Sequence, residues 1–305
     1  MMTIRHSSLA AAAAAMALAP VTVAAAQEND EWVRVPPSSR WIADFAEDSC
    51  ALRRTFEDGE RRFLLELRQF QPQTGMQIIV ASDMDRKKFR GVRLGFVPDT
   101  QIQEHQRAMA IDIDGYGEGV LDHITPYTED LRKLAEELRD AQSVSHVWTD
   151  EQRNARESEI DGIAIQLAYS DDIVLETGPM HDPFKIMRTC MDDLLGHWGI
   201  DAEAHRSLLR KVRPLNQERW VRPIIQNYPH EMLRNGEQAV VHVRLNVSAE
   251  GKPTDCTIQL PMSNPVFDRT SCAKLMKYAE FEPAIDSNGD PIDSVWITNV
   301  IYAMN

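Results

Sequence analysis

The sequence lacks the short motifs that identify many enzymes by a local pattern. It contains no GxSxG, no HExxH, no Walker loop and no CxxC, so no local signature points to a hydrolase, a zinc protease, a nucleotide-binding enzyme or a dithiol oxidoreductase. Basic residues are scarce as well, with 33 Lys and Arg against 47 Asp and Glu. A net charge of −14 argues against nucleic acid as a partner. We predict a protein that is not an enzyme, with no cofactor and no bound metal.

Long apolar runs are missing after the start of the chain. The polar residues Arg5 and His6 precede an Ala-rich apolar run over 9–18, which is followed by Pro20 and three alanines ending at Ala26. This order is typical of a secretory signal peptide, and the run is shorter than the roughly 20 residues of a membrane-spanning helix. We expect cleavage of residues 1–26 and a periplasmic protein. An uncleaved leader, which would anchor the chain in the inner membrane, is the alternative, and membrane association is expected only in that case.

Only four cysteines are present, and an exported protein tends to oxidise them in pairs. Cys190 lies on the apolar face of a predicted helix, and Cys50 shares a strand face with Leu52, so we pair Cys50 with Cys190. Two separate buried thiols are the alternative reading. Cys256 and Cys272 fall in a strand and a helix of one small unit and are expected to form the second disulfide.

Residues 27–200 predict a mostly antiparallel β domain with packed helices, and the whole chain is assigned to the α+β class. Strand-like segments, punctuated by Asp58-Gly59 and Pro72, are Ser49–Phe56, Phe63–Phe70, Met76–Ser82, Gly91–Phe96, Ala108–Ile113, Gly162–Tyr169 and Ile173–Glu176. One helix is predicted to begin at Pro126. A second is predicted from Asp182-Pro183, with Asp182 as N-cap candidate and Gly199 beyond its end. The role of this domain is not predicted.

Residues 201–222 contain six arginines and lysines and are read as a basic linker. A solvated connector lying against one of the domains is the favoured interpretation, and a dedicated partner site is the alternative. Beyond it, residues 223–305 predict a small ββαβ domain. Apolar and polar residues alternate over Glu237–Val247, a second strand covers Thr254–Leu260, and Asn264-Pro265 opens a helix that ends near Phe281. The final strand is predicted over Ser294–Ala303.

This C-terminal part carries a family resemblance, in fragments whose order and spacing run through the module. The fragments are Tyr228-Pro229, Gln238–Val247, Glu250-Gly251-Lys252, Asp255, Phe267-Asp268, Phe281-Glu282-Pro283-Ala284 and Asn288-Gly289-Asp290-Pro291. Together they resemble the TonB C-terminal domain over about 223–305. The sequence departs from the family pattern before the helix, where Met262-Ser263-Asn264 stands in place of the common Ser-Ser-Gly.

The resemblance implies a non-enzymatic function linked to transport across the outer membrane. In that family an extended peptide of an outer-membrane receptor adds as a strand to the edge of the small sheet. The final strand is the candidate edge, and its partner-binding residues would be Val295, Trp296, Ile297, Thr298, Asn299, Val300, Ile301 and Tyr302. The partner is expected to be a receptor peptide or another copy of the chain. A soluble periplasmic interaction or homodimerising protein with no role in energy transduction is the alternative.

Three weaker signals are assigned structural roles. His197 and His242 are interpreted as surface or structural residues. The segment 112–118 has acidic residues at the first and third positions of a calcium loop, but His123 stands where a bidentate Glu is required, which favours a Gly-rich turn. Asp192-Asp193 and Asp171-Asp172 are adjacent pairs; neighbouring residues on a helix point apart, so a shared carboxylate site is not expected.

Overall fold

The computed structural model describes residues 32–72, 75–84, 91–98, 108–126, 150–167, 171–225, 228–259 and 264–304. The predicted leader and the body of the helix predicted to begin at Pro126 lie outside the described residues. What is described has mixed α and β structure, with mainly antiparallel strand pairing. The α+β assignment is therefore confirmed.

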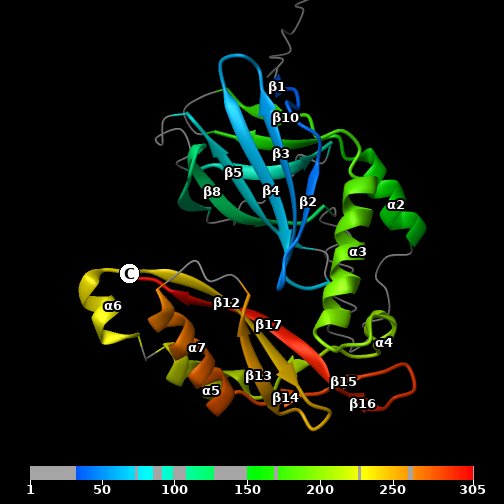
Figure 1. Cartoon of the computed structure of the whole chain (residues 1–305), viewed down its shortest axis with the longest axis vertical. Coiled ribbons are helices and arrows are strands. Elements are labelled where there is room, and N and C mark those ends of the chain that lie inside the picture. The colour runs from blue at the N-terminus through cyan, green and yellow to red at the C-terminus, as the bar shows by residue number, and fades with distance from the viewer. Residues whose placement is uncertain are drawn as a thin grey trace, which may run out of the picture. The chain divides into compact units, whose positions relative to one another are not determined.

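A six-stranded antiparallel sheet forms the centre of the N-terminal part (Figure 1). In spatial order its strands are β2 (Ile42–Phe45), β3 (Cys50–Glu57), β4 (Arg62–Gln69), β5 (Met76–Ser82), β8 (Gly117–Ile124) and β7 (Met109–Ile113). The hairpin between β3 and β4 turns at Asp58, whose carboxylate accepts the backbone N–H groups of Glu60 and Arg61. Gly59 follows it with φ of 89°, a backbone angle that suits glycine.

A second sheet of four strands packs its apolar side chains into the same core. Its order is β1 (Val33–Val35), β10 (Ile173–Leu175), β9 (Gly162–Gln166) and β6 (Arg93–Val97). β1 runs parallel to β10, and the other pairs are antiparallel. The sequence patterns locate β3 to β7, β9 and β10, but they do not reveal β1, β2 or β8.

Two helices accompany these sheets, α2 (Asp150–Glu159) and α3 (His181–His197). The predicted apolar face of α3 is buried as expected, including Met187, Cys190 and Leu194. The prediction for its start is wrong in detail. The N-cap residue is Met180, which makes no side-chain cap, and Asp182 lies in the first turn, where its charge suits the helix dipole. Gly199 takes the left-handed conformation after the end of the helix, as predicted.

The C-terminal part begins with four short elements and continues into the predicted ββαβ order, with three two-residue strands inserted between the helix and the last strand. The short elements are α4 (Ala202–Arg206), β11 (Arg213–Pro214), α5 (Gln217–Ile225) and α6 (His230–Asn235). After them come β12 (Ala239–Val247), β13 (Pro253–Ile258), α7 (Pro265–Tyr278), β14 (Phe281–Glu282), β15 (Ala284–Ile285), β16 (Pro291–Ile292) and β17 (Ser294–Tyr302). Asn264 caps α7 by accepting the N–H of Val266, and Pro265 occupies the first turn, as the sequence predicts.

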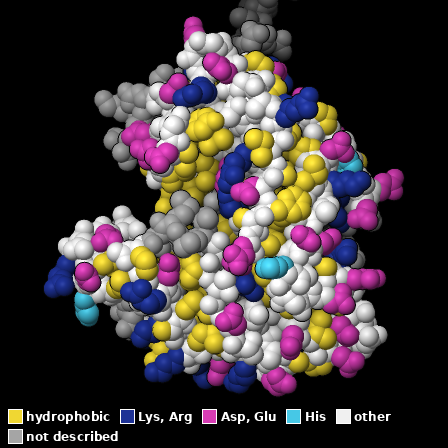
Figure 2. All heavy atoms as spheres, in the orientation of Figure 1, with side chains coloured by type: hydrophobic (Ala, Val, Ile, Leu, Met, Phe, Trp, Pro, Cys, Tyr) yellow, Lys and Arg dark blue, Asp and Glu magenta, His cyan; other side chains and the backbone are white. Residues whose placement is uncertain are grey.

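Two hydrophobic cores divide residues 32–305, which form one compact unit. We call residues 32–200, which supply nearly all of the first core, the N-terminal lobe. Residues 201–304, which supply the second, are the C-terminal lobe. Figure 1 shows α3 running alongside the strands of the N-terminal lobe, and β12 and β17 side by side in the C-terminal lobe. Acidic and basic side chains are interspersed over the face seen in Figure 2.

Candidate partner-binding edge

The last strand lies at an edge of the main C-terminal sheet. That sheet has the order β13-β12-β17, and β17 pairs antiparallel with β12 from Ser294 opposite Val247 to Tyr302 opposite Ala239. Among the described strands, no other pairs with β17. The segment singled out in the sequence is thus an edge strand of nine residues.

The register shows which backbone groups of β17 point away from the sheet. The N–H of Gln259 donates to the carbonyl of His242 at 2.9 Å, so the backbone groups of His242 face β13. Hydrogen-bonding directions alternate along a strand. Val241, Val243 and Leu245 therefore face β17, and their partners there use their backbone groups within the sheet. The groups that point outward belong to the alternate residues Val295, Ile297, Asn299 and Ile301.

These four residues differ sharply in exposure. Val295 is 8% exposed and is a member of the first core, and Ile297 is half-buried against that core. Asn299 is exposed, and Ile301 is 67% exposed, although it is a large apolar side chain. The edge is therefore closed at Val295 and open from Ile297 to Ile301.

The other four predicted residues turn their side chains toward α7. Trp296 and Val300 pack against the second core, and Tyr302 is buried in it. Tyr302 lies 4.6 Å from Phe267 between ring centroids, and its hydroxyl is 3.1 Å from Ser271 Oγ. Burial raises the pKa of this phenol. The packing of Trp296, Val300 and Tyr302 in the second core holds β17 in place.

The opposite face of the sheet is covered by the N-terminal lobe, with Arg244 at the contact. Its guanidinium donates to Asp48 Oδ1 at 3.1 Å and lies 4.4 Å from the ring centroid of Trp198. It also donates to the side chains of Asn246 and Thr257 on its own sheet. Arg244 is 7% exposed, and its charge is balanced by the partner carboxylate and the aromatic ring.

Two further contacts join the lobes. Gln259 donates from Nε2 to the carbonyls of Asp48 and Phe70, each at 3.0 Å. The ring of His242 stacks on Phe70 with centroids 4.3 Å apart. Burial lowers the pKa of His242 to about 4, and the nearby charges of His123 and Arg68 act in the same direction, whereas a hydrogen bond with Asn299 opposes them. His242 is therefore structural, as interpreted from sequence, and neutral near pH 7.

The segment read as a linker is partly folded into the second core. Leu208, Val212 and Trp220 are each less than 8% exposed and belong to that core. β11 pairs with β14, and the indole of Trp220 donates to the carbonyl of Leu215. Arginines between these apolar residues masked the pattern in the sequence. The folded C-terminal lobe therefore includes residues on the N-terminal side of 223.

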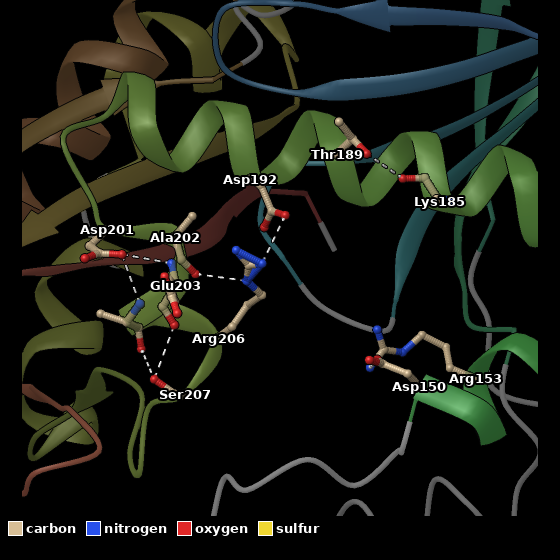
Figure 3. Close-up of polar contacts among 11 residues, drawn as sticks. Asp150, Arg153, Lys185, Thr189, Asp192, Asp201, Ala202, Glu203, Arg206 and Ser207 are labelled. Carbon is tan, nitrogen blue, oxygen red and sulfur yellow. Dashed lines mark hydrogen bonds and ion pairs between the residues drawn. The ribbon is translucent and has the colours of Figure 1, made fainter.

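Figure 3 shows the corner between α3 and α4, where Asp192 of the acidic pair Asp192-Asp193 lies near Arg206 of the basic segment 201–222. Asp201 caps α4 by accepting the N–H groups of Glu203 and Ala204, and Arg206 approaches Asp192 with a distance of 3.5 Å. Asp192 is thus in an exposed ion pair. Arg206, a basic residue of the segment predicted as a linker, lies against the N-terminal lobe at this point.

The remaining sequence candidates have structural positions. Both expected disulfides are present, Cys50 with Cys190 and Cys256 with Cys272. Residues 114–116 form the turn between β7 and β8, and His197 is exposed. Within the described ranges, no cluster of three or more His, Cys, Asp or Glu residues is arranged to hold a metal ion. No helix in the described part of the chain is both long and apolar enough to cross a membrane.

The Glu250-Gly251-Lys252 turn is in direct contact with the segment that begins at Phe281. Gly251 has φ of 75° in the β12–β13 turn, and its carbonyl accepts the N–H of Phe281. A Cβ at this position would lie 2.0 Å from the carbonyl oxygen of Phe281. Glycine is therefore required where the Glu250-Gly251-Lys252 turn meets the Phe281-Glu282-Pro283-Ala284 segment.

Comparison with protein families agrees with this arrangement. Residues 226–304 match the family described as Gram-negative bacterial TonB protein C-terminal. They form a TonB C-terminal domain. The matched family is one of cell-envelope domains for interaction and energy transduction, connected with transport and with outer-membrane receptors in general. No curated protein and no solved structure shows significant similarity to the chain.

Proposed function

We propose that the chain is a non-enzymatic periplasmic protein that binds an extended segment of a TonB-dependent outer-membrane receptor. The segment adds as a strand along β17. The observation that carries this proposal is the outward direction of the backbone groups of Ile297, Asn299 and Ile301 at an edge where the last two of these residues are exposed. Such groups can form a new ladder of main-chain hydrogen bonds with an incoming strand.

A single introduced thiol can test this proposal, because all four native cysteines are in disulfides. We expect Asn299→Cys, whose position is exposed on the edge, to crosslink in cells to an extended segment of a TonB-dependent receptor. Lys277→Cys, exposed on α7, is the matched control and should give no such product. The crosslinked peptide is identified by mass spectrometry. Reaction at both positions, or at neither, contradicts binding along β17.

The alternative partner at this edge is a second copy of the chain. Ile301 is a large exposed apolar side chain, and two edges that pair could bury it together. The same experiment separates the two. A product of Asn299→Cys that contains only two copies of the chain would replace receptor binding with self-association.

Whether the chain transmits force depends on its amino terminus. A cleaved leader leaves a protein that begins at Gln27 in the periplasm, which removes any anchor supplied by residues 1–26. We propose this cleavage, and with it an interaction role for the chain. Sequencing the amino terminus of the protein isolated from cells tests it, since a chain that retains Met1 and fractionates with the inner membrane would instead support an anchored transducer.

A further inference from the structure

The N-terminal lobe stands beside the edge at which we place the partner. This inference rests on the proposed function and adds a second component to the same site. The residues of β17 whose backbone groups point outward also direct their side chains to the face that carries His242 and Arg244, which is the face in contact with the N-terminal lobe. Any strand added to β17 has side chains on that face too, because paired residues of neighbouring strands point the same way.

The lobe limits how far such a strand can extend. At Val295 the edge is closed, since this residue is buried in the first core, and the neighbouring Ser294 is 2% exposed. Ile297 is half-buried against the same core, and the lobe leaves Asn299 and Ile301 exposed. Three outward positions therefore remain for main-chain pairing.

We propose that the N-terminal lobe forms one wall of the partner site. This wall ends the pairing of the added strand at Val295, and it contacts the side chain that the added strand places opposite Ile297. The partner is an extended segment with apolar side chains at two positions four residues apart, opposite Ile297 and Ile301, and with any compatible residue opposite Asn299. The contacts of Arg244 with Asp48 and Trp198, together with those of Gln259, hold this wall against the sheet.

Amide hydrogen exchange at single-residue resolution tests the register. The probe is a synthetic decapeptide selected from a random linear library for binding to the purified chain. At 100 times its Kd, the peptide should slow exchange of the Ile297, Asn299 and Ile301 amides by about 100-fold. The Thr298 and Val300 amides, which already face β12, should change little. The Val295 amide should be slow without peptide and show no further effect.

Photocrosslinking tests the wall directly on the unmodified protein. A benzophenone side chain placed in the peptide opposite Ile297 should attach to residues of the N-terminal lobe. Attachment confined to residues 201–304, or equal peptide protection of Val295 and Ile297, would overturn the wall and leave strand addition standing. Binding of the peptide with no protection of any outward β17 amide would instead overturn the proposed function.

A variant of the wall provides a second measurement. Asp48→Ala removes the carboxylate that pairs with Arg244 without altering β12 or β17, and it should make the Val295 amide exchange faster and become protectable by the peptide. Asp44→Ala is the matched control, because Asp44 lies in the same lobe but pairs with Arg53. A Val295 amide that stays slow in a folded Asp48→Ala chain would show that Asp48 does not hold the wall, and a fast Val295 amide in the unmodified chain would overturn the wall itself.

Discussion

The two disulfides should contribute unequally to stability, because they close loops of very different length. Cys50 and Cys190 are separated by 140 residues, and Cys256 and Cys272 by 16. A disulfide lowers the conformational entropy of the unfolded chain by an amount that grows with the logarithm of the loop length. At these separations the stabilisation is about 5 kcal/mol for the first disulfide and about 3 kcal/mol for the second.

The perturbation is a pair of double variants, Cys50→Ala/Cys190→Ala and Cys256→Ala/Cys272→Ala. Each removes one cross-link from one lobe. Removing sulfur also leaves space in the packing, more so in the N-terminal lobe, where both cysteines are no more than 2% exposed. Cys256 and Cys272 are half-buried, so their packing loss is smaller.

Urea unfolding followed by circular dichroism, under oxidising and reducing conditions, separates the two effects. Under reducing conditions a variant differs from the native chain in packing alone, and under oxidising conditions it differs in packing and in the cross-link. The difference between these two comparisons is the contribution of the cross-link, and we expect it to be about 2 kcal/mol larger for Cys50–Cys190. An equal or larger contribution from Cys256–Cys272 would refute the argument from loop length.

Two further predictions concern single residues. Gly251→Ala should destabilise the chain by at least about 3 kcal/mol in the same urea assay, because it combines a strained positive φ with a clash against Phe281. Gly289 has φ of 91° but no neighbouring atom within 4 Å, so Gly289→Ala should destabilise the chain by only about 1 to 2 kcal/mol. Equal losses would contradict the close approach of Gly251 to Phe281. The pKa of His242 is about 4 in the folded chain and 6.5 in the unfolded chain. As the pH falls, the unfolded chain therefore binds a proton at this residue before the folded chain does. The stability that the neutral ring provides above pH 6.5 should be lost, by ~3 kcal/mol, as the pH falls toward 4. His242→Phe retains a ring against Phe70 and should flatten this decline, and an unchanged pH profile would show that His242 is not the group responsible.

The C-terminal domain could be predicted from sequence because its signals are local. Strict alternation along 239–247 predicts β12, Asn264-Pro265 predicts the start of α7, and a turn in each hairpin predicts the order of the strands. β1 and β2 are only three and four residues long, so they hold too few residues for a period to be read. β8 begins at Gly117, inside the segment 112–118 that the sequence predicts to be a Gly-rich turn, and a second glycine at 119 weakens its strand pattern further. A Cβ at 119 would meet the backbone of Val80 and Ala81.

The contact between the lobes could not be predicted, because its residues imitate a solvent-facing strand. His242 and Arg244 alternate with valines and leucine along β12, which is the usual pattern of a sheet with one wet face. Both are less than 8% exposed. Arg244 can be buried because Asp48, about 200 residues earlier in the chain, supplies a carboxylate, and this pairing has no trace in local spacing.

β17 connects the two cores, and this bears on how it could bind a partner. Its Val295 end is fixed in the first core and its Tyr302 end in the second, so both ends of the open segment are held by packing. The residues between them, from Ile297 to Ile301, are kept extended by pairing with β12. A strand that adds there meets a preformed edge, so the cost of ordering falls on the incoming peptide alone. The N-terminal lobe therefore contributes to the candidate site in two ways, by ordering the edge and by limiting its length.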